Sequence, residues 1–227
     1  TTGEDNTALG YAALDANTTG DHNVALGYNS LGTNTTGNYN TAVGSYALYD
    51  NTGNDNTAIG YNSLANTTTG TTNVAVGKDS LTDNTTGYDN TAIGEGALES
   101  NTTGFENTAV GQSALTASTT GQGNVAVGHQ ALRLVSTSDW NVGLGEWAGQ
   151  DITSGANNVC LGYASGSSAS PNGSLTTGSN YIVVGNNSHT HAYIKIDWTV
   201  TSDRRDKTDI EPFNHGLSWI NKLNPVT

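Results

Sequence analysis

Two polar side chains near the C-terminus, Ser202 and Lys207, are of the types needed for nucleophilic chemistry. A serine hydroxyl becomes a nucleophile when a nearby base removes its proton, and a lysine with a depressed pKa can act as that base. Their spacing, taken alone, favours a polar loop exposed to solvent. The sequence around the pair must therefore decide between the two interpretations.

His189 and His191 form an H-x-H pair, the second pattern with chemical potential. On a strand both rings would face the same side, and three copies in a trimer would present enough imidazoles to surround a metal ion. The simpler interpretation is a loop with two solvated histidines. We adopt that interpretation and expect no metal.

Other reactive residue types have simpler explanations. Cys160 stands where other repeats have alanine, which predicts a small buried residue. Trp140, Trp147 and Trp198 lie where the repeats degrade, and we expect them to cap the end of the repeat array. Asn17-Thr18-Thr19 and its equivalents match glycosylation sequons, but the repeat explains them as turns. No phosphate loop, zinc pattern or pair of catalytic carboxylates appears, and no cofactor is expected.

Of these residues, those before residue 163, Cys160 included, lie in copies of a 17-residue repeat, N-[T/V]-A-[L/V/I]-G-x-x-[A/S]-L-x-x-N-T-T-G-x-x. Its ten copies begin at Asn6, Asn23, Asn40, Asn56, Asn73, Asn90, Asn107, Asn124, Asn141 and Asn158. One spacing is 16 because Asn51-Thr52-Gly53 lacks a threonine. Such a period predicts a solenoid, in which each unit buries its apolar face only by stacking on its neighbours.

Each unit is expected to contain strands, because its glycines and β-branched threonines disfavour helix. N-T-A-V-G and x-x-A-L predict two short strands, and N-T-T-G predicts a turn. One interior column is expected from Leu9, Leu26, Val43, Ile59, Val76, Ile93, Val110, Val127, Leu144 and Leu161. A second is expected from Leu14, Leu31, Leu48, Leu64, Leu81, Leu98, Leu115 and Leu132. The repeated asparagines are expected to form amide ladders along the stack.

Composition limits the possible partners. Only 34% of the residues are hydrophobic, so each coil has a small core, which favours oligomerisation. The net charge of −13 disfavours binding to nucleic acid or to anionic lipid. No apolar run is long enough for a membrane span, so no membrane insertion is expected.

Three regions are predicted. Residues 1–162 form the β-solenoid shaft, and residues 163–201 form an insertion loop and a trimeric β neck, with an alternating strand at 192–198. Residues 202–227 end in a predicted helix at 216–223. The chain lacks an initiator methionine and begins within a repeat, so we expect it to be part of a longer protein.

The repeat resembles the β-roll of trimeric autotransporter adhesin heads. Those heads stack short coils around a strand of small and apolar residues followed by glycine, here Asn23-Val24-Ala25-Leu26-Gly27. The coil of that family is shorter, so the likeness is one of architecture. It covers roughly residues 3–162 and implies a homotrimer.

The tail resembles the start of the endosialidase-type intramolecular chaperone domain that phage tail fibres and tailspikes carry at their C-termini. The matching residues are Ser202-Asp203-Arg204-Arg205, Lys207, Asp209-Ile210 and a G-L-x-x-[I/V]-x-x-L-x-P pattern that ends at Pro225. In that family the domain drives trimer assembly and then cuts itself off. The resemblance implies a cut between Thr201 and Ser202, made by a Ser202/Lys207 dyad. Asp206 stands where many members have leucine, and the match covers only the first part of the domain.

Together these features predict a structural, homotrimeric tail fibre segment of a bacteriophage, extracellular and located in the virion. Its partners would be itself and a host cell-surface receptor, a glycan being one option, and its only enzymatic step would be self-cleavage. A bacterial trimeric surface adhesin is one alternative. An ice-binding solenoid is another, because threonines recur at β spacing, although they lie in turns beside glycine.

Overall fold

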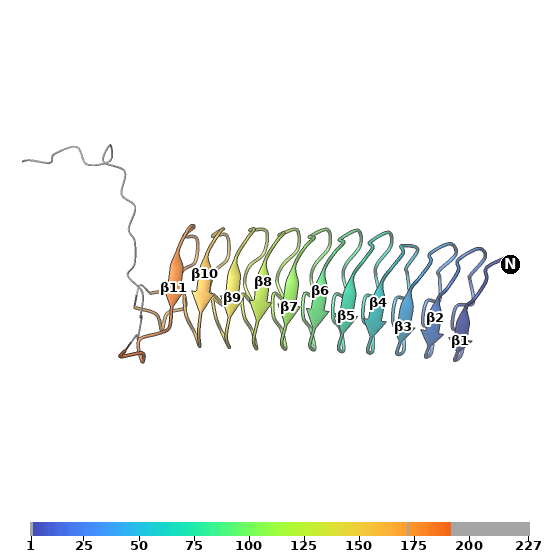
Figure 1. Cartoon of the computed structure of the whole chain (residues 1–227), viewed down its shortest axis with the longest axis horizontal. Helices are drawn as coiled ribbons and strands as arrows, with labels where there is room; N and C mark the ends of the chain where they lie inside the picture. Colours follow the sequence, from blue (N-terminus) through green and yellow to red (C-terminus); the bar gives the residue numbers. More distant parts are fainter. Residues whose placement is uncertain (1, 172, 192–227) are drawn as a thin grey trace, which may run out of the picture. The chain divides into compact units, whose positions relative to one another are not determined.

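The computed structural model describes residues 2–171 and 173–191, and its first compact unit, Thr1–Thr190, is a parallel β-solenoid. The eleven strands of the described residues form one sheet in chain order (Figure 1). They are β1 Thr7–Leu9, β2 Val24–Leu26, β3 Thr41–Val43, β4 Thr57–Ile59, β5 Val74–Val76, β6 Thr91–Ile93, β7 Thr108–Val110, β8 Val125–Val127, β9 Val142–Leu144, β10 Val159–Leu161 and β11 Ile182–Val184. The predicted all-β solenoid with 17-residue coils is confirmed.

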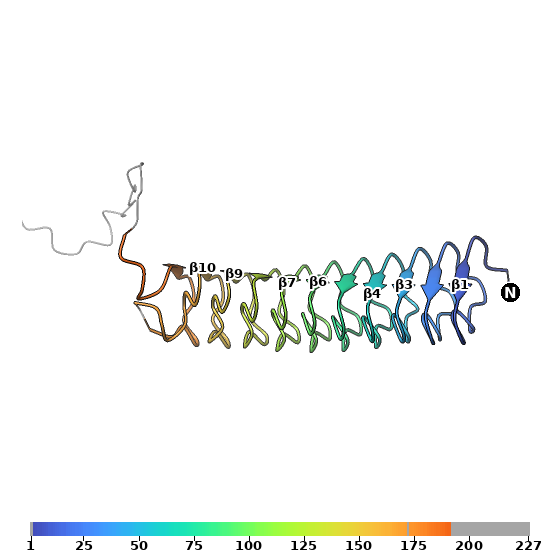
Figure 2. The ribbon, with the colours of Figure 1, turned by 90° about the horizontal axis from the view of Figure 1, so that it is seen from below.

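Equivalent residues of successive coils pair with one another along the whole sheet. In β5 and β6, for example, Val74 pairs with Thr91 and Val76 with Ile93. The strands occupy one side of the stack, and the turns that connect them occupy the other (Figure 2). Each repeat position therefore forms a column that runs along the unit.

The second strand predicted for each repeat is absent from the described coils, and a tight corner takes its place. In the coil that contains β5, Asp79 and Leu81 have positive φ angles of 54° and 50°. This left-handed conformation costs about 1–2 kcal/mol for a residue with a side chain. Backbone bonds between coils help to hold it, such as that from Leu81 N to the Ala97 carbonyl at 3.0 Å. The prediction of a second strand was wrong because the chain bends at every second residue here.

The first predicted interior column faces outward, and the prediction was wrong. The central residue of each strand, alanine in β1 to β8, is the one that points inward: Ala75 and Ala92 are fully buried, whereas Ile93 is 41% exposed. Neighbouring strand residues point to opposite faces, so an inward alanine forces both of its neighbours outward. At β9, where glycine takes the alanine position, even a Cβ at Gly143 would lie 2.8 Å from Leu132 Cγ, so the interior there has no room for a side chain.

The second predicted column and the amide ladder are confirmed. Leu31, Leu48, Leu64, Leu81, Leu98, Leu115 and Leu132 are fully buried, and only Leu14 of the predicted set is partly buried. In the ladder, Asn90 Nδ2 donates to Asn73 Oδ1 at 3.1 Å and to the Gly104 carbonyl at 2.8 Å. Asn90 Oδ1 accepts from Asn107 N at 3.1 Å. Each buried amide therefore links several coils.

The solenoid continues beyond the boundary expected at residue 162. Strand β11 pairs in parallel with β10, so that Val159 lies beside Ile182. The coil between them is longer, and Tyr181 N donates to Asn158 Oδ1 across 23 residues. The described residues 163–171 and 173–178 therefore belong to an enlarged turn within the stack. The strand predicted at 192–198 and the helix predicted at 216–223 lie outside the described residues.

Candidate interaction surface

The outward residues of the strands form the most extensive apolar surface of the described chain. Each strand contributes its first and third side chain, which gives 22 side chains over eleven strands, and we call this surface the β face. Many are well exposed, including Leu9 at 68%, Ile182 at 69% and Val184 at 66%. Large exposed apolar patches on soluble proteins mark interaction sites.

The β face is uncharged. All of its 22 side chains, in the strands of the described residues, are threonine, valine, isoleucine or leucine. This composition contrasts with a chain whose net charge is −13. Like charges repel when two copies approach, so the β face is the surface across which repulsion between copies would be weakest.

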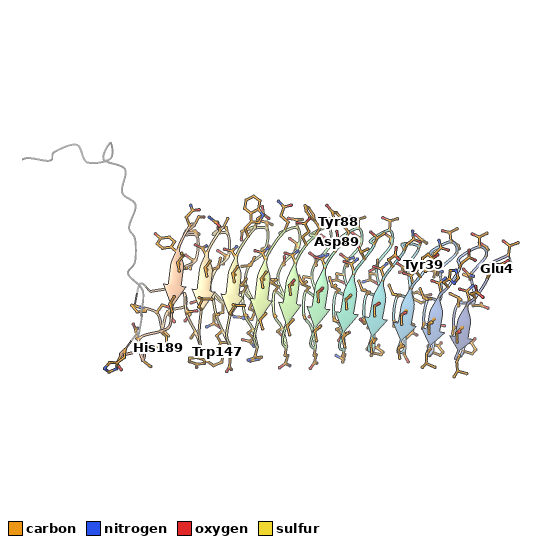
Figure 3. The ribbon with its side chains drawn as sticks, in the orientation of Figure 1. Glu4, Tyr39, Tyr88, Asp89, Trp147 and His189 are labelled. Carbon is orange, nitrogen blue, oxygen red and sulfur yellow. The ribbon has the colours of Figure 1, made fainter. Side chains whose placement is uncertain are left out.

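Charged and aromatic side chains line the two edges of the β face. Figure 3 shows Tyr88 and Asp89 at the edge where the strands begin and Trp147 at the edge where they end. Beyond the second edge, Lys78 Nζ lies against Asp79 Oδ2, and this contact raises the pKa of the lysine. Lys78 also lies 3.8 Å from Glu95 Oε1 in the next coil. These polar edges give the β face a defined width.

Aromatic rings stack along the same edges, an arrangement that the sequence analysis missed. The rings of Tyr11 and Tyr28 are 5.2 Å apart, and those of Tyr88 and Phe105 are 4.7 Å apart. The signal was available, because the members of each pair lie one repeat apart. The rings of Trp147 and Tyr163 are 5.3 Å apart and tilted by 43°.

The tryptophans do not cap the solenoid as expected. Trp140 precedes β9, is 59% exposed and belongs to the edge opposite Trp147. Two further strands, β10 and β11, follow both residues. Trp198 lies outside the described residues.

Cys160 behaves as the sequence predicts. It occupies the central, inward position of β10 and is fully buried. Desolvation raises the pKa of its thiol to about 11, so the thiol is protonated at neutral pH. This residue acts as a packing element of the core.

His189 makes local contacts within its turn. Its Nδ1 lies 3.0 Å from both Asn186 N and Asn186 Oδ1. Within residues 2–171 and 173–191, His, Cys, Asp and Glu do not form a group of three that could hold a metal ion. His191 belongs to the second compact unit of the chain. A metal held jointly by several copies stays an untested possibility of the sequence pattern.

Ser202 and Lys207, the pair expected to carry self-cleavage, lie outside the described residues, as does the bond between Thr201 and Ser202. In the described part of the chain, no helix is long and apolar enough to cross a membrane. Comparison with protein-family models, curated proteins and solved structures finds no match.

Proposed function

We propose that three copies of this chain associate through their β faces into a homotrimeric fibre shaft. The observation that carries the proposal is the β face itself: it is uncharged, consists of aliphatic residues and threonine, and has regularly spaced strands on a strongly acidic chain. A second copy of the chain offers the same pitch, and so its side chains fall between or against those of the first at every coil. Burial of the β face also supplies the apolar contacts that the small interior of each coil lacks.

The size of the β face suits a stable assembly. A standard protein interface involves about 20–30 residues from each partner. In a trimer the 22 outward side chains of one copy are divided between two neighbours, so residues at the edges of the β face must contribute to each interface as well. A threefold arrangement buries the face of every copy around one axis, and the choice of three copies rests on the resemblances to trimeric adhesin heads and to the endosialidase-type chaperone.

The function of such a shaft is mechanical, and we assign it to a bacteriophage tail fibre that serves attachment to a host cell. This assignment rests on the tail that resembles the endosialidase-type chaperone and on the repeat that resembles trimeric adhesin heads. In this proposal the shaft is part of the virion and extracellular, and it presents a receptor-binding tip, with a glycan among the receptors to test. Ser202 and Lys207 would separate the chaperone from the shaft by one cut.

A bacterial trimeric surface adhesin would use the same shaft, so the neighbouring genes discriminate between the two assignments. Ice binding receives less support from the turns. There Thr18 Oγ1 donates to the Thr35 carbonyl at 2.9 Å, and Thr85 Oγ1 donates to the Thr102 carbonyl at 2.9 Å. Hydroxyls used within the stack do not donate to an ordered water layer.

Sedimentation equilibrium tests the trimer. We expect a mass three times that of the 23.4 kDa chain. Val76→Asp places a carboxylate on the β face and should yield a monomer whose circular dichroism still shows β structure. Thr86→Asp adds the same charge to an exposed turn of the same coil and should leave the trimer intact. A wild-type chain that stays monomeric at micromolar concentration would refute the proposal.

A further inference from the structure

The β face has two zones of different composition. In β1 to β7, five of the seven strands carry threonine at their first outward position. These are Thr7, Thr41, Thr57, Thr91 and Thr108. In β8 to β11, both outward positions of every strand are aliphatic. Because a methyl group in place of a hydroxyl increases the apolar area buried on contact, the second zone gains more from association.

The interior changes composition at the same coil. The repeat position that opens the N-T-T-G turn is polar in the first seven coils and apolar in the next three. Its members are Asn17, Asn34, Asn51, Thr67, Asn84, Asn101 and Ser118, followed by Val135, Ile152 and Leu175. Val135 and Ile152 are fully buried and Leu175 is 6% exposed. The switch occurs in the coil of β8, where the outer face also becomes aliphatic.

The polar part of this interior column is incompletely hydrogen bonded. Within the described residues, Thr67 Oγ1, Asn101 Oδ1 and Ser118 Oγ are buried and have no hydrogen-bond partner. An unpaired buried polar atom destabilises the folded state. The apolar members that replace them from Val135 onward carry no such atoms, so this column is free of the cost there. In the coils of β8 and β9, however, Arg133 Nε, Ser138 Oγ and Trp147 Nε1 are also buried without a partner.

The rest of the core adjusts to the switch. Gly149 and Gly166 take the positions that leucine holds in earlier coils. A Cβ at Gly149 would lie 2.6 Å from Leu132 Cδ2 and 3.2 Å from Ile152 Cδ1, so the new aliphatic side chains fill the space. Residues 124–190 thus combine an apolar interior column with a fully aliphatic outer face, and we call them the apolar block.

We infer that the apolar block is the site at which copies of this chain first bind one another, and that pairing then spreads toward β1. The inference rests on the proposed trimer and adds a direction to its assembly. The partner is a second copy of the chain. Its own β face is uncharged and has the same strand spacing, so it matches the outward aliphatic side chains of β8 to β11. The strands of the first zone, β1 to β7, pair later, because the contacts already made hold the copies close together.

Matched substitutions in the full chain test the inference. Val142→Thr/Val159→Thr changes the outer face of the apolar block, and Val24→Thr/Val74→Thr makes the same exchange in the first zone. All four residues point outward, and threonine has nearly the shape of valine. Assembly is started by dilution from urea and followed by light scattering. The first pair should slow trimer formation at least about tenfold, and the second less than about twofold.

A variant that is expected to strengthen association serves as a control, because a misfolded chain could not give that result. Thr91→Val/Thr108→Val extends the aliphatic surface through β6 and β7 and should slow trimer dissociation at least about fivefold. Equal effects of the two valine-to-threonine pairs, or a larger effect of the pair in β2 and β5, would overturn the directional inference and leave the trimer standing. A wild-type chain that never associates would overturn both.

Discussion

At the scale of single residues, the small residue in the middle of each strand, alanine in β1 to β8, determines which side chains face the interior. In β2 to β8 this alanine is buried, and both flanking residues lie on the outer face; glycine, cysteine and valine take its place in β9, β10 and β11. The asparagine that precedes each strand adds a second constraint. Its amide group satisfies backbone groups of neighbouring coils that would otherwise be buried without partners.

Enlargement of an inward alanine should destabilise the solenoid. Ala92→Leu inserts three carbons into a filled interior, and we expect a loss of about 1–3 kcal/mol in the free energy of unfolding. Thr91→Leu introduces the same side chain one residue earlier, where it points outward, and should cost less than about 0.5 kcal/mol. Urea unfolding followed by circular dichroism measures both values. Equal losses would mean that the two positions have been assigned to the wrong faces.

Removal of one amide from the ladder should have a large effect. Asn90→Ala leaves the Gly104 carbonyl and Asn107 N buried without this partner, and we expect a loss of about 2–5 kcal/mol. Asn66→Ala removes an exposed amide that bonds to Asp83 Oδ1 and should change stability by less than about 0.5 kcal/mol. Thermal and urea unfolding compare the two variants. A ladder that tolerated Asn90→Ala as easily as Asn66→Ala would not be a stabilising element.

At the scale of the element, the coil tolerates a change of length in its turns and not in its strand. The coil of β3 has 16 residues because Asn51-Thr52-Gly53 lacks a threonine, yet Thr41 still pairs with Thr57. The coil of β10 is longer, and its strand also keeps its pairing with β11. The variable segment in both cases lies between the buried leucine position and the turn glycine.

Two single-residue deletions separate these parts of the coil. Deletion of Thr103 leaves Asn101-Thr102-Gly104, the turn already present in the coil of β3, and should cost less than about 1 kcal/mol. Deletion of Ala109 from β7 exchanges the inward and outward residues of that strand and should cost more than about 4 kcal/mol. Urea midpoints of the two variants test this contrast. Comparable losses would show that strand register is not the limiting constraint.

The sequence predicted the coil length, the parallel stack, the leucine column and the amide ladder, because each depends on a residue type that recurs at one repeat position. The prediction from the sequence was wrong where either of two neighbouring apolar residues could face the interior. Val76 is larger and more hydrophobic than Ala75, and hydrophobicity alone places it inside. The limit is steric, because the depth of the interior depends on the corner formed by residues such as Asp79 and Leu81, whose positive φ angles no simple periodicity reveals.

At the scale of the whole molecule, the proposed trimer and the proposed chaperone would form one assembly pathway. Cleavage between Thr201 and Ser202 after assembly would make the stability of the shaft kinetic, because the separated chaperone could no longer guide refolding. We expect the complete gene product to give a shortened band on a denaturing gel and a fragment that begins at Ser202. Ser202→Ala should stay full length and still form trimers.

Two further results bear on that prediction. Lys207→Ala should slow the cut if the lysine is the base that activates the serine. Processing of Ser202→Ala at the wild-type rate would exclude the serine as nucleophile. Absence of processing in both chains would mean that the chaperone is retained as a permanent cap.

The uniform pairing of one strand with the next also has an evolutionary consequence. Duplication or loss of one repeat in the gene would lengthen or shorten the unit by one coil and leave every remaining strand paired as before. Such events before β8 would not touch residues 124–190. The number of coils can therefore change in whole repeats among descendants of this gene, while the block that we propose brings copies together is inherited intact.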